Sequence, residues 1–324
     1  MEEYHYLLDL ALILFTTKLF GLISQKFKMP QVVGALLAGL ILGPAVLNIV
    51  QKSNFITTTS EIGVIILMFC AGLETDVKEL KKCGKASFVI ALLGVIVPLL
   101  GGFGVAYFFN QPGIIDSGAT CNVFLQNVFI GVILTATSVS ITVETLKELG
   151  RLKSESGNAI LGAAIIDDIL GIIALTVITS LADSSVNVWI VLLKILGFFA
   201  MVIVAGFAFY KLYVWWANRS KHLRHRHAII CFVFCLGMSY AAEALFGVAD
   251  ITGAFFAGLI ISLTQSSEYL AKKFDVLSYL LLSPIFFASI GLNVVLPSMS
   301  VQIIVFAVVI TIVAIITKII GCGL

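Results

Sequence analysis

Two short stretches decide the fold of this chain: residues 34–41 read GALLAGLI, and residues 253–260 read GAFFAGLI. Six of the eight positions are identical, at an offset of 219 residues. The same offset carries Gly72 and Leu73 onto Gly291 and Leu292. Because two matches share one offset, we interpret them as an internal repeat. Chance is the alternative, since strings of Gly, Ala and Leu are common in membrane helices.

The composition indicates the class of protein that carries this repeat. Of the 324 residues, 60% are hydrophobic and only 12% are charged, with a mean hydropathy of +1.10. Soluble domains contain roughly 45–50% apolar and about 25% charged residues, so soluble enzymes, nucleic-acid-binding proteins and disordered chains are excluded. A net charge of +2 is too balanced to indicate a polyanionic partner. The composition predicts an all-α polytopic membrane protein embedded in the lipid bilayer.

Apolar stretches of about 17–25 residues are long enough to cross the hydrocarbon core. We expect eleven spans, at residues 7–25, 30–50, 59–76, 85–109, 122–147, 156–182, 187–215, 227–247, 250–266, 276–294 and 299–324. With the N-terminus outside, fifteen basic residues fall in odd-numbered loops and only Lys52 in an even-numbered one. Because cytoplasmic loops carry an excess of Lys and Arg, we expect a multi-pass cell-membrane protein with its N-terminus outside and its basic loops in the cytoplasm.

The repeat carries the second span onto the ninth, seven spans further along the chain. An odd difference means that the two copies cross the membrane in opposite directions, and inverted repeats are typical of secondary transporters. The same offset would place copies of spans five and six near residues 341–366 and 375–401, past Leu324. We therefore expect a truncated sequence that lacks the last two spans of its fold; the alternative is a second half that is itself shorter by two helices.

Asp167 and Asp168 lie at the centre of the sixth span, in the sequence GAAIIDDILGII. A charge at the bilayer centre costs at least about 2.5–3.5 kcal/mol on insertion scales, and intramembrane carboxylates mark ion or proton sites. A purely structural pair is the weaker interpretation. Lys318 in the last span is the natural partner of one aspartate, unless it lies near enough to a helix end to extend to the interface.

The fifth span supplies neutral oxygen ligands, including Thr137 and Ser138, in the sequence TATSVSIT at residues 135–142. Hydroxyl groups can bond to backbone carbonyls and loosen a helix, and irregular backbone at membrane depth is tolerated only where protein or a cavity surrounds it. We expect an unwound stretch here; the alternative is a regular helix. Carboxylate, hydroxyl and carbonyl oxygens together predict a site for an alkali cation.

Residues 135–173 resemble the signature region of the monovalent cation:proton antiporter family, in its second branch; they read TATSVSITVETLKELGRLKSESGNAILGAAIIDDILGII. The stretches GALLAGLILGP, LMFCAGLETDVKEL, GAFFAGLIIS and PIFFASIGL are also similar to that family, in the same order. The resemblance covers essentially the whole chain. It implies a sodium/hydrogen exchanger-like membrane domain of thirteen spans, with a dimer domain, a mobile core and two broken helices near an acidic site.

The resemblance also implies a domain organisation and a homodimer. Residues 1–84 and 183–298 would form the dimer domain, residues 85–182 the core with the ion site, and residues 299–324 the start of the second half of the core. Eleven of the thirteen expected spans would then be present.

The site residues follow from the same resemblance. Asp168 is implied to be the essential carboxylate that binds the cation or the proton. Asp167 would be a second acid, paired with Lys318 in one state. Thr137 would lie in the first broken helix and support the site, and Ser138 beside it is a further expected cation ligand.

The expected function is secondary active exchange of a monovalent cation, Na⁺ or alternatively K⁺ or Li⁺, for protons by alternating access, with no enzymatic activity and no cofactor. An Asp-Asp pair with a lysine resembles the electrogenic members. A channel, or another inverted-repeat carrier such as a sodium-coupled solute symporter, is the alternative. An intramembrane aspartyl protease is disfavoured because its two acids would face each other from separate helices.

A basic loop at residues 219–227 holds three of the four histidines, in the sequence RSKHLRHRH. Histidine titrates near neutral pH, so this loop is interpreted either as an ordinary cytoplasmic loop or as a pH sensor.

Overall fold

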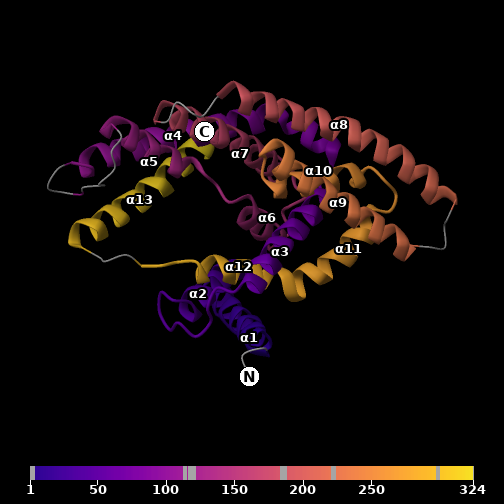
Figure 1. Ribbon diagram of the computed structural model, residues 1–324, viewed down its shortest axis with the longest axis horizontal. Coiled ribbons are helices and arrows are strands. Elements are labelled where there is room, and N and C mark those ends of the chain that lie inside the picture. The colour runs from indigo at the N-terminus through magenta and orange to yellow at the C-terminus, as the bar shows by residue number, and fades with distance from the viewer. Residues whose placement is uncertain are drawn as a thin grey trace. The chain divides into compact units, whose positions relative to one another are not determined.

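The computed structural model describes residues 4–111, 115, 122–182, 188–219, 224–296 and 300–323, and all regular structure in these residues is helical (Figure 1). The helices are α1 (His5–Lys26), α2 (Gln31–Leu42), α3 (Asn54–Glu74), α4 (Val77–Phe109), α5 (Val123–Thr135), α6 (Val139–Glu148), α7 (Glu155–Ala182), α8 (Val188–Arg219), α9 (Arg224–Phe246), α10 (Asp250–Ser262), α11 (Ser267–Leu277), the π-helical turn η2 (Ser278–Leu282), α12 (Ser283–Leu292) and α13 (Val301–Gly323). The prediction of an all-α protein is confirmed.

Nine helical segments in the described chain are long and apolar enough to cross a membrane, with α5 and α6 counted as one and α11 to α12 as another. The two shorter apolar helices, α2 and α10, bring the total to eleven elements where eleven spans were predicted. They have 12 and 13 residues, fewer than the about 20 that a spanning helix needs. The helix α2 ends because Gly43 and Pro44 follow it, and proline cannot continue a helix.

The chain divides into two compact units. Unit 1 comprises Met1–Val77, Ser140–Ser154 and Phe198–Leu296, and unit 2 comprises Lys78–Val139, Glu155–Gly197 and Pro297–Leu324. The helix α6 therefore belongs to unit 1, although α5 and α7, which flank it in the sequence, belong to unit 2.

In unit 1, the two copies of the repeat make equivalent contacts. The helix α2 packs on α1 and α12, and α10 packs on α9 and α3. Glycines permit both crossings: a Cβ added at Gly39 would lie 2.0 Å from the Ala288 carbonyl oxygen, and one added at Gly258 would lie 2.3 Å from that of Phe69. Gly39 and Gly258 are separated by the repeat offset of 219 residues. Backbone contact at such glycines is typical of packed membrane helices.

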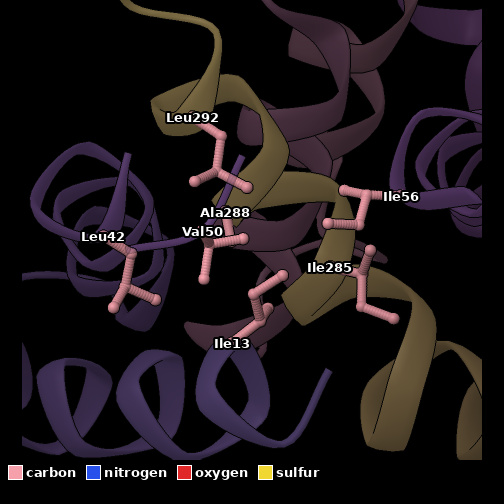
Figure 2. Close-up of a cluster of buried hydrophobic side chains, with 7 residues drawn as sticks. All are labelled: Ile13, Leu42, Val50, Ile56, Ile285, Ala288 and Leu292. Atoms are coloured by element: carbon pink, nitrogen blue, oxygen red, sulfur yellow. The ribbon is translucent and has the colours of Figure 1, made fainter. Parts of the chain in front are cut away.

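An apolar cluster fixes the first copy of the repeat in unit 1 (Figure 2). Its buried members come from α1, α2, α3 and α12 and from the segment before α3: Ile13, Leu42, Val50, Ile56, Ile285, Ala288 and Leu292. Since these side chains are at most 5% exposed, the short helix α2 is held by tertiary packing that compensates for its length.

In unit 2, α4 is the helix on which three others pack. A Cβ added at Gly131 of α5 would lie 2.5 Å from the Leu99 carbonyl oxygen, and one at Gly321 of α13 would lie 2.7 Å from that of Leu93. The helix α7 is tied to α4 by the Ser87 hydroxyl, which donates to the Ala159 carbonyl at 3.0 Å. This packing brings α5, α7 and α13 around one helix, and these three carry the predicted site residues.

Candidate functional site

The polypeptide leaves the helical conformation at residues 136–138, between α5 and α6. Ala136 has extended backbone angles, with φ −61° and ψ 128°. The predicted unwinding of TATSVSIT is therefore confirmed. Because Thr135 is the last residue of α5, its carbonyl oxygen has no acceptor role within the helix and is available to another donor.

A proline within α4 frees a second carbonyl oxygen. In a regular α-helix the Gly94 carbonyl would accept a hydrogen bond from the N–H of residue 98. That residue is Pro98, which has no N–H. The Gly94 carbonyl thus lies inside a membrane-spanning helix without its usual partner.

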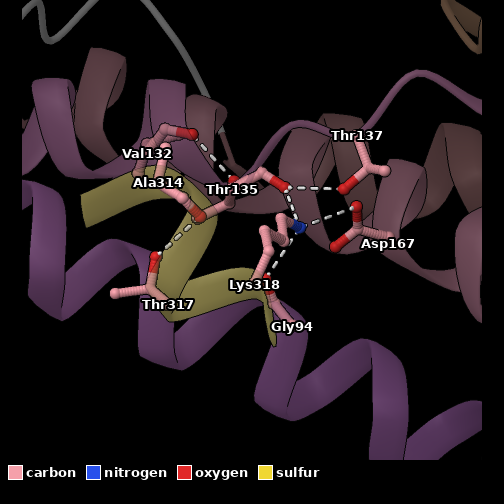
Figure 3. Close-up of polar contacts among 8 residues, drawn as sticks. All are labelled: Gly94, Val132, Thr135, Thr137, Asp167, Ala314, Thr317 and Lys318. Atoms are coloured by element: carbon pink, nitrogen blue, oxygen red, sulfur yellow. Dashed lines mark hydrogen bonds and ion pairs between the residues drawn. The ribbon is translucent and has the colours of Figure 1, made fainter. Parts of the chain in front are cut away.

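The Lys318 side chain on α13 supplies the donor for both of these carbonyls. Its Nζ donates to the Gly94 oxygen at 2.9 Å and to the Thr135 oxygen at 2.7 Å. A buried polar group without a hydrogen bond is costly, so this lysine stabilises both the break that follows α5 and the proline turn of α4. Figure 3 shows the ammonium group between the two carbonyls.

The same ammonium group forms an ion pair with Asp167. Lys318 Nζ lies 3.6 Å from Asp167 Oδ2, and the side chains are 24% and 7% exposed, respectively. Thr137 faces the carboxylate from the break (Figure 3) and interacts with it through its hydroxyl. The other carboxylate oxygen, Oδ1, is buried and has no hydrogen-bond partner among the described residues. The structure therefore joins Asp167, Lys318 and Thr137 in one polar site.

Asp168 occupies the next position of α7, about 100° further round the helix. It is partly exposed, whereas Asp167 is buried. Among the described residues, Asp168 forms no ion pair with Lys318. Ser138 ends the break directly after Thr137. The site thus contains one acid engaged by a lysine and a neighbouring acid that is free of it.

The family follows from comparison with known proteins. The model described as "Sodium/hydrogen exchanger, transmembrane" matches residues 11–324. This chain belongs to the sodium/hydrogen exchanger family. It is a family of transporters and not of enzymes.

Relatives of this exchanger-family chain extend over most of its length. It is 40% identical over 319 residues to the "Probable Na(+)/H(+) antiporter GerT" of Bacillus cereus, covering 98% of this chain and 81% of that protein. It is 39% identical over 326 residues to the "Na(+)/H(+)-K(+) antiporter GerN" of the same organism, covering 99% and 80%. Among solved structures, the fold is similar to that of the sodium proton antiporter MjNhaP1 from Methanocaldococcus jannaschii, with a TM-score of 0.70 over 99% of this chain and 79% of that one, at 22% identity.

The carbonyl partners of Lys318 in this exchanger-family chain were missed at the level of sequence. One signal was present in the sequence: Pro98 lies inside an apolar span. Because proline has no N–H, the carbonyl of Gly94, four residues earlier, loses its helical hydrogen bond. The role of Thr135 could be predicted in part from the sequence, because the expected unwinding leaves a free carbonyl at the end of the preceding helix. Neither pattern indicates that a side chain more than 180 residues away would bond to both.

The basic loop of this exchanger-family chain is shorter than predicted. The helix α8 continues to Arg219 and α9 begins at Arg224, so part of the predicted loop is helical. His227 is buried in the first turn of α9, with its ring centroid 4.4 Å from that of Trp216. His222 and the side chain of His225 lie outside the described residues. His227, the one histidine of this loop whose side chain the structure describes, is therefore packed against an aromatic ring and not in a solvated loop.

Proposed function

We propose that this chain exchanges a monovalent cation for protons across the membrane. The observation that carries this proposal is the pair of adjacent carboxylates within α7, of which Asp167 pairs with Lys318 and Asp168 does not. A carboxylate without a fixed counter-charge inside a membrane protein needs a cation or a proton. The names of the relatives, Na⁺/H⁺ and Na⁺/H⁺-K⁺ antiporters, support the same activity with Na⁺ or K⁺ as the cation.

Asp168 is the proposed exchange carboxylate. Removal from water disfavours the charged form of a carboxyl group, so either a proton or a cation must neutralise it before the site changes its exposure. The proton and the cation then compete for one carboxylate. The site changes its exposure in one direction with the cation bound and in the other with the proton bound. Thr137 and Ser138 would contribute oxygen ligands from the break in the α5–α6 segment.

Asp167 and Lys318 have a different proposed role. The ammonium group keeps Asp167 ionised while no cation is bound, and a bound cation would take over part of that role. If Lys318 changes its partner during the transport cycle, its positive charge moves as well. This favours electrogenic exchange. Unit 2, which holds these residues, is the proposed mobile core, and unit 1 is the proposed scaffold through which two copies form a homodimer.

The proposed location is the cell membrane, with the N-terminus outside. The orientation is inferred from the distribution of basic residues, because cytoplasmic loops carry an excess of Lys and Arg. A cysteine placed at Arg151 would then react with a membrane-impermeant thiol reagent only in inside-out vesicles.

The exchange activity is tested in everted membrane vesicles that carry the protein, with Asp168→Asn beside the unchanged chain. We expect addition of Na⁺ or K⁺ to release protons from acidified vesicles with the unchanged protein and not with Asp168→Asn, because an amide takes up no proton and carries no negative charge for a cation to neutralise. The matched control is Asp76→Asn, an exposed residue just after α3, which should retain exchange. Cation-dependent proton flux that survives Asp168→Asn would contradict the assignment.

A further inference from the structure

Two adjoining cavities lie within unit 1, and the carboxylate of Glu144 on α6 borders both of them. The larger cavity, of about 310 Å³, is lined by α1, α2, α6, η2 and α12. The smaller, of about 200 Å³, also reaches α11. Among the described residues, Glu144 forms no ion pair or hydrogen bond. An ionisable group without a partner inside a membrane protein indicates a functional site.

The other charged groups of the smaller cavity already have partners. Lys147 forms an ion pair with Asp275. Glu148 accepts a hydrogen bond from the Gln31 backbone N–H at 2.7 Å, at the N-terminus of α2. Glu144 is therefore the carboxylate of this cavity whose charge is available to a ligand.

The larger cavity also contains a positive charge. Lys18 lines it from α1 and donates a hydrogen bond to the Tyr279 hydroxyl, with its Nζ 4.6 Å from the centre of that ring. Tyr279 is a neutral partner, and Lys18 forms no ion pair in the part of the chain that the structure describes. The larger cavity is thus bordered by one carboxylate and one ammonium group, and these two do not pair with each other.

Much of the wall between these charges is apolar. Val32 and Phe287, at the base of the cavity, are 3% and 2% exposed, whereas Tyr279 and Leu280, at its edge, are 48% and 64% exposed. The cavity therefore extends from the interior of unit 1 to its surface. A ligand that fits it has an apolar part and a headgroup with charges of both signs.

The two charges lie near one end of their helices. The Gln25 side chain of α1 donates to Glu148 of α6 at 3.0 Å, so the last turns of these two helices lie together. Lys18 and Glu144 precede the helix ends at Lys26 and Glu148 by about 12 Å and about 6 Å, respectively, at the α-helical rise per residue. Both charges are therefore close to the level at which lipid headgroups meet acyl chains.

We propose that the larger cavity binds one phospholipid with an ethanolamine headgroup. Its primary ammonium group pairs with Glu144, its phosphate pairs with Lys18, and an acyl chain lies against the apolar wall. An anionic glycerol headgroup would leave Glu144 unpaired, and a choline headgroup has no N–H to donate to the carboxylate. The site lies wholly within unit 1 and does not depend on exchange activity, so its test is separate from that of the proposed function.

The lipid is tested first with the unchanged, full-length protein, delipidated in detergent. Native mass spectrometry measures the binding of phosphatidylethanolamine, phosphatidylcholine and phosphatidylglycerol with identical acyl chains. We expect one phosphatidylethanolamine to bind at least about fivefold more tightly than either of the others, because only its headgroup makes both charge-assisted contacts. Equal affinity for the three lipids would overturn the proposal, and this comparison needs no variant.

Two variants then assign the headgroup contacts. Glu144→Gln keeps the side-chain shape and should abolish the preference for phosphatidylethanolamine over phosphatidylglycerol. Lys18→Met should weaken the binding of both lipids. The matched controls are Glu268→Gln and Lys272→Met, which change an exposed ion pair on α11 outside both cavities and should leave the preference intact. A preference that survives Glu144→Gln would contradict the site.

Thermal unfolding in detergent gives a second readout of the same binding. A ligand that binds only the folded state raises the midpoint of unfolding. We expect phosphatidylethanolamine to raise the midpoint equally in the unchanged protein and in Glu268→Gln, and not in Glu144→Gln. If the variants at Glu144 and Lys18 instead change the proportion of dimer while lipid preference stays the same, a second copy of the chain covers this cavity and the lipid proposal is refuted.

Discussion

At the scale of single residues, Lys318 makes the largest number of distinct contacts at the site. It joins a carboxylate to two backbone carbonyls, one freed by Pro98 and the other by the end of α5. Removing one partner of a buried ion pair is strongly destabilising because the other charge remains buried. The site therefore depends on this lysine for its stability as well as for its proposed chemistry.

We expect Lys318→Met to lower the stability of the folded protein by on the order of 3–5 kcal/mol, measured as a lower midpoint of thermal unfolding in detergent. The double variant Asp167→Asn/Lys318→Met should recover part of the loss, because no unpaired carboxylate is then buried. The control is Lys82→Met, from a pair with Glu79 in which the lysine is 70% exposed; its effect should be at most about 1 kcal/mol. Equal midpoints for the two single variants would refute the role given to Lys318.

A substitution of Thr137 tests whether the hydroxyl groups of the break bind the cation. Thr137→Val keeps the shape of the side chain and removes its hydroxyl. Loss of one hydrogen-bonding oxygen is worth about 0.5–1.5 kcal/mol, so we expect the KM for the cation to rise by roughly two- to thirteenfold with the maximal rate little changed. Thr137→Ser, which keeps the oxygen, should resemble the unchanged protein. An unchanged KM in Thr137→Val would exclude the hydroxyl as a ligand.

At the scale of elements, the sequence allowed prediction of most helices and of the break, but not of their lengths or partners. The apolar runs and the hydroxyl cluster are local signals, and both were interpreted correctly. The length of α2 was not, because the run from residue 30 to 50 stays apolar after Gly43 and Pro44 end the helix. The attachment of α6 to unit 1 could not be predicted either, since it depends on the ion pairs of Lys147 with Asp275 and Glu74, which no local pattern links to α6.

The glycine crossings give a prediction at this scale. Gly39→Ala places a methyl group 2.0 Å from the Ala288 carbonyl oxygen, so α2 and α12 must separate. Overpacking of this kind costs about 1–3 kcal/mol, which we expect as a lower thermal midpoint. Gly84→Ala is the control, because an added Cβ there meets nothing within 4 Å. If both variants unfold at the same temperature, the crossing is not as tight as described.

At the scale of the whole molecule, the adjacent acids of α7 predict how exchange depends on pH. A proton and a cation that compete for one carboxylate cannot bind together, so lower pH reduces the fraction of sites open to the cation. We expect the apparent KM for Na⁺ or K⁺ to rise by up to tenfold for each unit of falling pH while the maximal rate changes much less, in proteoliposomes with equal pH on both sides. A KM that is independent of pH would indicate separate sites for the two ions.

The family and the carboxylate pair were the parts of the function that local sequence could predict, because both are encoded in continuous motifs such as GAAIIDDILGII. The pairing of Lys318 with one acid could be anticipated only from its opposite charge and from the resemblance. The two carbonyls beside it could not, because they become acceptors only when α4, α5 and α13 pack together.

The oxygen atoms around the Lys318 ammonium group are one carboxylate and two carbonyls, the same types that hold an alkali ion in a filter or carrier. The chain therefore supplies a tethered cation of its own at this place. Its local concentration is set by the covalent chain and not by the surrounding solution. Any free ion that binds to these oxygens must displace the ammonium group, so the affinity of a free ion for them is lower than the same oxygens would give without the lysine.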